Sequence, residues 1–179
     1  MNRHLVIACL LVLCLCGACE QKKKESPVKK ESPVKQDTFV KFTSHLGNSF
    51  VAPSMWTADD KGDTYSLKSP DQQAIIHAIM FTAKGSDTID EFKEMLSYGL
   101  LPKGATGWLQ SDWTSIKLAN ADAMKRDLVP IPAGGQEWRL YVVHADRFYY
   151  AVILNASTPM MQLNGPFYES IVRTFECVH

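Results

Sequence analysis

The chain has 179 residues and 46% of them are hydrophobic, so it can form the core of one domain of ordinary size once an export signal is removed. The 19 basic and 19 acidic residues balance overall, but from residue 38 onward there are 12 basic and 15 acidic residues, a net charge near −3. A folded part with this charge lacks the strongly basic surface of a nucleic-acid-binding domain, and we expect no nucleic-acid partner.

The first residues have the layout of a bacterial export signal. Arg3 and His4 precede an apolar run of about eleven residues at positions 5–15, and the small residues Gly17 and Ala18 follow it. A permanent transmembrane helix needs about 20 apolar residues, so a membrane-spanning anchor is the weaker interpretation of this run.

The end of this signal resembles the lipobox of bacterial lipoproteins, through Gly17 and Ala18 directly before Cys19. The resemblance implies a lipoprotein signal peptide at residues 1–18 and acyl chains, palmitate among them, on Cys19. Cys16 stands where the lipobox usually has leucine, and it is itself the weaker candidate for acylation because a bulky leucine precedes it. One acyl chain anchors only marginally, whereas two or three on Cys19 hold the protein firmly at a membrane.

The cell envelope is therefore the expected location, with the protein facing the periplasm. Glu20, rather than an aspartate, follows the acylated cysteine, and this favours the outer membrane over the inner membrane.

The hexapeptide at residues 24–29, Lys-Glu-Ser-Pro-Val-Lys, is repeated at residues 30–35. Because residues 19–37 have almost no apolar side chains, we predict a disordered tether there. Binding of its lysines to anionic headgroups or peptidoglycan is the alternative.

A single domain is predicted from residue 38 to residue 179, beginning with β-strands. The strand at residues 73–82 has apolar side chains on both faces, so we expect other elements to pack against both of them. Trp56 is expected to fill an edge of the core. The early segments comprise strands at 39–42, 49–51, 64–68 and 73–82, forming a meander, and a solvated turn at 59–63.

A helix and two further strands are expected in the middle of the chain. Thr88 and Glu91 form a capping-box pattern before a helical apolar stripe that ends near Gly99. Strands are predicted at residues 108–118 and 121–129, and a loop at residues 130–135.

The strongest β signal is a hairpin of residues 137–144 and 147–155. Both faces of both strands are apolar, so these are expected to be central strands with helices packed over each face. Thr158 and Pro159 begin a final helix, whose apolar stripe comprises Phe167, Ile171, Val172 and Phe175. The predicted class is α+β, an antiparallel β-sheet flanked by helices.

The segment with Phe50, Pro53 and Trp56 resembles the opening of PsbP-like domains. The long hairpin, the switch into a helix at residues 155–159 and the ending at residues 171–175 fit the same pattern. The resemblance implies the α/β/α sandwich of the PsbP, Mog and DcrB-type proteins, which bind or support larger assemblies. The superfamily has no common catalytic motif to transfer.

Motifs for chemistry are not found in the sequence. The histidines are scattered, the acidic turn at residues 59–63 does not match a calcium loop, and no phosphate-binding loop or serine-nucleophile motif is present. His77 and His144 lie within predicted strands and are expected to be satisfied core or edge residues. Lone Cys177 is expected to be a small buried side chain rather than a nucleophile. We predict no catalytic residues, no metal and no cofactor.

Six aromatic residues either fill the core or form a recognition surface, and we favour the core for most of them: Trp108, Trp113, Trp138, Tyr141, Tyr149 and Tyr150. Trp108 and Trp113 are the candidates for contact with an envelope protein. The leading hypothesis is a lipid-anchored envelope protein with a non-enzymatic domain for binding or assembly support. A lipoprotein that binds a small molecule or peptidoglycan is the second, and an enzyme of unrecognised type is the third.

Overall fold

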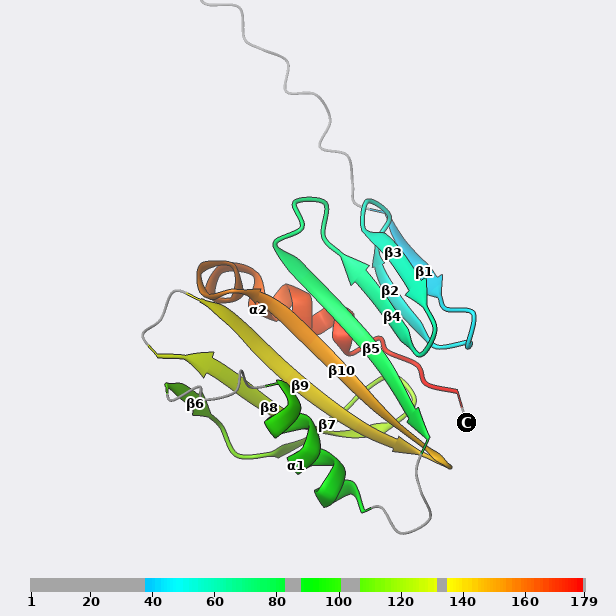
Figure 1. The fold of residues 1–179 in the computed structure, drawn as a ribbon. Helices are drawn as coiled ribbons and strands as arrows, with labels where there is room; N and C mark the ends of the chain where they lie inside the picture. The colour runs from blue at the N-terminus through cyan, green and yellow to red at the C-terminus, as the bar shows by residue number, and fades with distance from the viewer. Residues whose placement is uncertain (1–37, 83–87, 101–106, 132–134, 179) are drawn as a thin grey trace, which may run out of the picture. The chain divides into compact units, whose positions relative to one another are not determined.

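The computed structural model describes residues 38–82, 88–100, 107–131 and 135–178, so the predicted signal peptide and tether lie outside these ranges. The described part of the chain forms ten strands and two helices (Figure 1). They are β1 (Phe39–Thr43), β2 (Ser49–Pro53), β3 (Thr57–Lys61), β4 (Thr64–Lys68), β5 (Ala74–Thr82), α1 (Ile89–Leu100), β6 (Trp108–Gln110), β7 (Thr114–Lys117), β8 (Asp122–Pro130), β9 (Gln136–Ala145), β10 (Phe148–Ser157) and α2 (Thr158–Val172). Neither of these helices has the length and apolarity needed to cross a membrane.

Eight strands form one antiparallel sheet in the order β3-β4-β5-β10-β9-β8-β6, and β7 pairs with another stretch of β8 (Figure 1). The predicted hairpin is β9 and β10, and its turn contains Asp146 with a φ of +52°, a conformation that aspartate tolerates. Strand β10 lies between β5 and β9 and pairs with both along most of its length. The prediction that the hairpin strands are central is confirmed.

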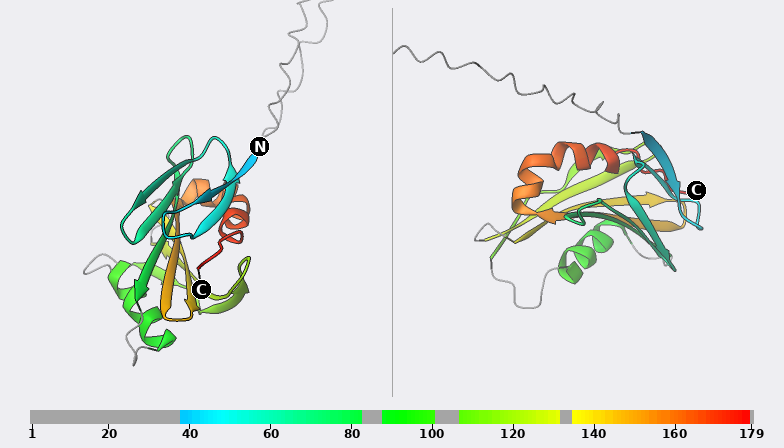
Figure 2. Two further views of the ribbon diagram at one scale, coloured as in Figure 1. Left: turned by 90° about the vertical axis from the view of Figure 1, so that its right-hand side faces the viewer. Right: turned by 90° about the horizontal axis from the view of Figure 1, so that it is seen from above.

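Both faces of this sheet are covered, which confirms the predicted α+β arrangement. Helix α1 packs on one face, and α2 with the small β1–β2 sheet packs on the other (Figure 2). Because side chains alternate along a strand, β9 sends Leu140 and Val142 to the α1 face and Tyr141 and Val143 to the α2 face. Each face therefore supplies its own hydrophobic core.

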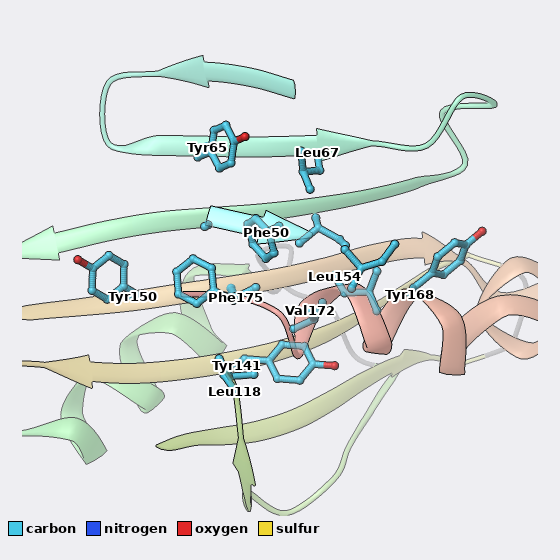
Figure 3. Close-up of a cluster of buried hydrophobic side chains, with 14 of the residues drawn as sticks. Phe50, Tyr65, Leu67, Leu118, Tyr141, Tyr150, Leu154, Tyr168, Val172 and Phe175 are labelled. Atoms are coloured by element: carbon cyan, nitrogen blue, oxygen red, sulfur yellow. The ribbon is translucent and has the colours of Figure 1, made fainter. Parts of the chain in front are cut away.

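The larger core, on the α2 face, contains a cluster of aromatic rings (Figure 3). The ring of Phe50 lies 4.9 Å from that of Phe175 and 6.2 Å from that of Tyr65, between centroids. Phe175 follows the end of α2, and the next residue, Glu176, exchanges backbone hydrogen bonds of 3.0 and 2.9 Å with Ser49. An extended C-terminal segment, rather than a longer helix, therefore brings Phe175 into this core.

Local signals place α1 correctly. The hydroxyl of Thr88 accepts a hydrogen bond from the backbone N–H of Glu91 at 3.2 Å, and the Glu91 carboxylate accepts one from the Thr88 N–H at 2.8 Å. This is the predicted capping box. Phe92 and Leu96 of the predicted stripe are buried against the sheet.

Two predictions of strand boundaries and one of strand pairing are wrong. Residues 59–61 belong to β3 rather than to a turn, and the turn is confined to the residues around Gly62. Strand β3 is an edge strand with mostly exposed side chains, so its composition is as polar as that of a turn. The predicted strand at 108–118 is split into β6 and β7 at residues 111–113, where the N–H of Ser111 bonds the carbonyl of Asp127 at 3.0 Å. Finally, β1 and β2 form a separate two-stranded sheet and do not join the β3–β4–β5 meander.

A partly buried ion network joins α2 to the sheet. The carboxylate of Glu169 accepts hydrogen bonds from Lys125 Nζ and, at 3.2 Å, from the Tyr141 hydroxyl, and it forms an ion pair with Arg139 Nη1 at 2.9 Å. Burial works against the charged carboxylate, but these three partners outweigh it and lower the pKa of Glu169. Gly165 leaves room for this arrangement, because a Cβ there would lie 2.9 Å from the Arg139 guanidinium.

We expect Glu169→Gln to lose about 2 kcal/mol of unfolding free energy at pH 7, because Lys125 and Arg139 lose their nearer carboxylate and keep only the more distant one of Asp127, at 3.5 and 3.9 Å. The folded-state pKa of Glu169 is lowered from its ordinary value of 4.5. This stabilisation is therefore complete above that value and disappears as the pH falls through the folded-state pKa. Urea unfolding at about pH 7 and about pH 3 measures it, with exposed Glu94→Gln as the control. An equal loss at both pH values contradicts the prediction.

Candidate functional site

A groove opens on the α2 face where the end of β2, the turn between β4 and β5 and the first turns of α2 meet. Its volume is about 200 Å³. We call it the aromatic groove, and it is lined by Pro53, Met55, Trp56, Ser69, Pro70, Asp71, Met160, Asn164, Phe167 and Tyr168.

Helix α2 supplies its residues to the groove through regular helical spacing. Met160, Asn164 and Phe167 are separated by four and three residues, so they lie along one side of the helix. The helix starts directly after β10, with Ser157 rather than the predicted Thr158 at the N-cap. Phe167 belongs to the predicted apolar stripe, yet its side chain is 40% exposed and borders the groove.

The inner wall of the groove contains Trp56 and Tyr168, both buried, as predicted for Trp56. Their ring centroids lie 6.1 Å apart in an edge-on arrangement, and the ring of Phe167 lies 5.9 Å from that of Tyr168. The Asn164 amide donates a hydrogen bond to the Tyr168 hydroxyl at 3.4 Å. Burial raises the pKa of Tyr168, so its hydroxyl stays neutral and remains a hydrogen-bonding group at neutral pH.

The turn between β4 and β5 places one carboxylate in the groove. The Ser69 hydroxyl and the backbone N–H of Gln73, the latter at 3.1 Å, both donate to Asp71 Oδ1. These bonds lower the pKa of Asp71, so the side chain is charged at neutral pH. Among the described residues Asp71 forms no ion pair, and the groove lining contains no cation.

Large apolar side chains are exposed at the groove and on the neighbouring surface of α2. Met55 is 55% exposed, and Leu163, which the helical spacing puts on the same side of α2 as Met160 and Phe167, is 75% exposed. A cluster of exposed apolar side chains next to a concave surface is typical of a site for protein or ligand contact. The groove thus combines buried aromatic anchors with an apolar rim and one negative charge.

These residue types favour binding over catalysis. The ten lining residues include no histidine, lysine or cysteine that could activate the Ser69 hydroxyl as a nucleophile, and this hydroxyl already donates to Asp71. No group of three or more metal-ligating side chains comes together within the described residues.

The two tryptophans predicted to contact a partner lie on the opposite, α1 face and are half-buried. Trp108 packs on Trp138 with 5.5 Å between ring centroids. Trp113 lies beneath Arg126 at 4.7 Å and Lys93 at 5.6 Å, in cation–π contacts. The structure therefore does not bring them into the aromatic groove, and partner contact through them stays a prediction.

The remaining sequence candidates take no part in the groove. Cys19 lies outside the described residues. Cys177 is buried, as expected, and burial raises the pKa of its thiol. His77 is half-buried and shares a 2.7 Å hydrogen bond with the Ser66 hydroxyl, and exposed His144 stacks on Tyr149. His77 is thus a satisfied strand residue, as predicted, and His144 lies in β9, as predicted, with its ring exposed.

Part of the groove coincides with residues that the sequence already indicates for another reason. Pro53 and Trp56 are two of the three residues that carry the PsbP-like resemblance, and both line the groove. Met55 lies between them, and the signal available in the sequence was an apolar side chain directly before Trp56. Asp71 gave no sequence signal beyond that of an ordinary turn residue.

Comparison with known proteins bears on the fold. No family model and no curated protein matches the sequence. Among solved structures, the chain is similar to the solution structure of cyanobacterial PsbP (CyanoP) from Synechocystis sp. PCC 6803, with a TM-score of 0.57 and 8% identity over 86% of this chain and 100% of that one. The fold is PsbP-like.

A second similar structure is the Ran-binding protein Mog1p of Saccharomyces cerevisiae. Its TM-score is 0.53, with 10% identity over 78% of this chain and 95% of Mog1p. The PsbP-like resemblance predicted from Phe50, Pro53 and Trp56 is thereby confirmed at the level of the fold. Likeness at this identity establishes the fold and transfers no activity.

Proposed function

We propose that this chain is a lipid-anchored protein of the cell envelope, and that its PsbP-like domain binds a protein partner through the aromatic groove without catalysing a reaction. The observation that carries the proposal is the groove itself. Exposed Met55 and Phe167 line it together with the buried rings of Trp56 and Tyr168, and exposed Leu163 lies on the same side of α2 as Phe167. Buried aromatic anchors within an apolar surface are the features that dominate binding energy at protein interfaces.

The size of the groove favours a protein partner over a small molecule. Pockets for small molecules usually measure about 300–1,000 Å³. The aromatic groove, at about 200 Å³, is smaller, and two of its large apolar side chains, Met55 and Phe167, are exposed to solvent. Mog1p, whose fold is similar, is named for binding a protein, Ran. A segment of a larger partner, lying across the rim and inserting a side chain, fits this surface better than an enclosed small molecule.

The anchor rests on the sequence at the start of the chain. Gly17, Ala18 and Cys19 resemble a lipobox, and the Pro- and Lys-rich residues 20–37 follow. An acylated Cys19 would retain the protein at a membrane, and the tether would give the domain reach. Glu20 favours the outer membrane.

The binding proposal is tested by photo-crosslinking in cells, with p-benzoyl-phenylalanine introduced in place of Phe167. We expect one protein to be captured, because this exposed ring borders the groove. Mass spectrometry identifies the adduct. Adding Met55→Asp, which puts a charge on the rim, is expected to reduce capture by roughly tenfold.

The matched control carries the same crosslinker in place of Tyr98, an exposed aromatic residue of α1 on the opposite face of the sheet. It is expected to capture either nothing or different proteins. The same adducts from both positions, or capture that Met55→Asp leaves unchanged, would refute the groove as the binding surface.

A further inference from the structure

We infer that the aromatic groove selects a partner segment in which a lysine or arginine lies next to an apolar side chain. This inference rests on the proposed function and adds the chemistry of the ligand. It follows from the charge of Asp71 and from the apolar character of the other groove residues.

The charge of Asp71 is available for a partner. Ser69 and the Gln73 N–H stabilise its ionised form while leaving Asp71 Oδ2 without a hydrogen bond from another described residue. No other acidic or basic side chain lines the groove, so its local charge is negative and uncompensated. A carboxylate in this setting attracts a cation and disfavours an acidic segment.

Aromatic rings in the same groove also favour a cationic side chain. Asp71 and Tyr168 line the same groove, and the negative charge of Asp71 adds to burial in raising the pKa of the Tyr168 hydroxyl. Trp56 and Phe167 both lie against Tyr168. A guanidinium or ammonium group that reaches Asp71 therefore approaches aromatic rings, which attract cations, and its methylene stem can pack on apolar surface.

The apolar rim supplies the second requirement. Met55 is a flexible, polarisable side chain that adapts to different apolar partners. Met55, Leu163 and Phe167 together present exposed apolar surface. A partner that contributed only a lysine or arginine would leave this surface exposed to water. An apolar residue adjacent to the cation covers this surface and excludes water from around the ion pair, which strengthens the pair.

The test uses the purified full-length chain in detergent micelles and a phage-displayed library of random dodecapeptides. We expect enriched sequences to place Lys or Arg within two residues of Phe, Trp, Leu or Met. The most enriched peptide is then synthesised with a fluorescent label, and its Kd is measured by anisotropy for four variants. Enrichment of acidic sequences, or the lack of any enrichment, contradicts the inference.

Asp71→Asn removes the charge and keeps the Oδ1 acceptor of the turn, and we expect it to weaken binding about two- to fivefold. Raising salt to about 0.5 M should weaken binding to the wild-type chain and have little effect on the variant. Asp122→Asn, at an exposed carboxylate outside the groove, should leave the Kd unchanged. Phe167→Ala should weaken binding about tenfold and Tyr98→Ala should have no effect.

These variants separate the two proposals. If Phe167→Ala weakens binding and Asp71→Asn does not, the groove binds partners but the selection for a cation is wrong. If neither variant has an effect, the groove is not the binding surface and both proposals fail.

Discussion

Phe50→Ala is expected to lower the free energy of unfolding by about 3–5 kcal/mol, the usual cost of truncating a fully buried phenylalanine. The ring of Phe50 has no exposed surface and contacts the rings of Phe175 and Tyr65 from two other segments of the chain (Figure 3). Its loss leaves a cavity where β2, β4 and the C-terminal segment meet. Urea unfolding followed by tryptophan fluorescence measures the change.

Phe39→Ala is the matched control for this prediction. Phe39 lies on β1 in the same two-stranded sheet, but it is 50% exposed, so its removal should change stability by less than about 1 kcal/mol. A similar loss for both variants would show that the cluster around Phe50 is not the main core.

Cys19→Ala is expected to abolish lipid labelling of the chain and to leave the unprocessed precursor. Lipoprotein signal peptidases act once the cysteine thiol carries diacylglycerol, and alanine has no thiol. Metabolic labelling with an alkyne fatty acid reports acylation, and gel mobility of the precursor reports processing.

Cys16→Ala is the control for the anchor, since Cys16 is the other candidate for acylation. Its labelling and processing are expected to equal those of the wild type. Labelling that persists in Cys19→Ala and disappears in Cys16→Ala would move the anchor to Cys16.

Several elements of the fold are readable from short stretches of sequence. The hairpin of β9 and β10 has apolar residues on both faces, which marks central strands wherever they occur in a chain. Helix α1 carries its own start signal in Thr88 and Glu91. In both cases the pattern depends only on residues that are close in sequence, through the alternation of a strand or the cap of a helix, so it can be recognised without the tertiary structure.

Edge elements were less predictable. Strand β3 has the composition of a turn because an edge strand exposes its side chains, and the break between β6 and β7 depends on hydrogen bonds between Ser111 and Asp127, 16 residues apart. Neither feature has a periodic signal of its own. Pairing with a neighbouring strand determines both features: β3 pairs with β4, which follows it directly, and β6 and β7 pair with β8.

The sequence is sufficient for the class of fold, since its periodicities and its PsbP-like segment already indicate a helix-flanked antiparallel sheet. It also carries the lipobox-like motif, because a signal is recognised as a linear stretch. The aromatic groove, in contrast, is determined only by the tertiary structure. Its lining comes from residues 53–56, 69–71 and 160–168, and whether Phe167 is core or surface depends on how α2 rotates when Tyr168 and Ile171 are buried. Helical spacing leaves that rotation open, and packing against the sheet determines it.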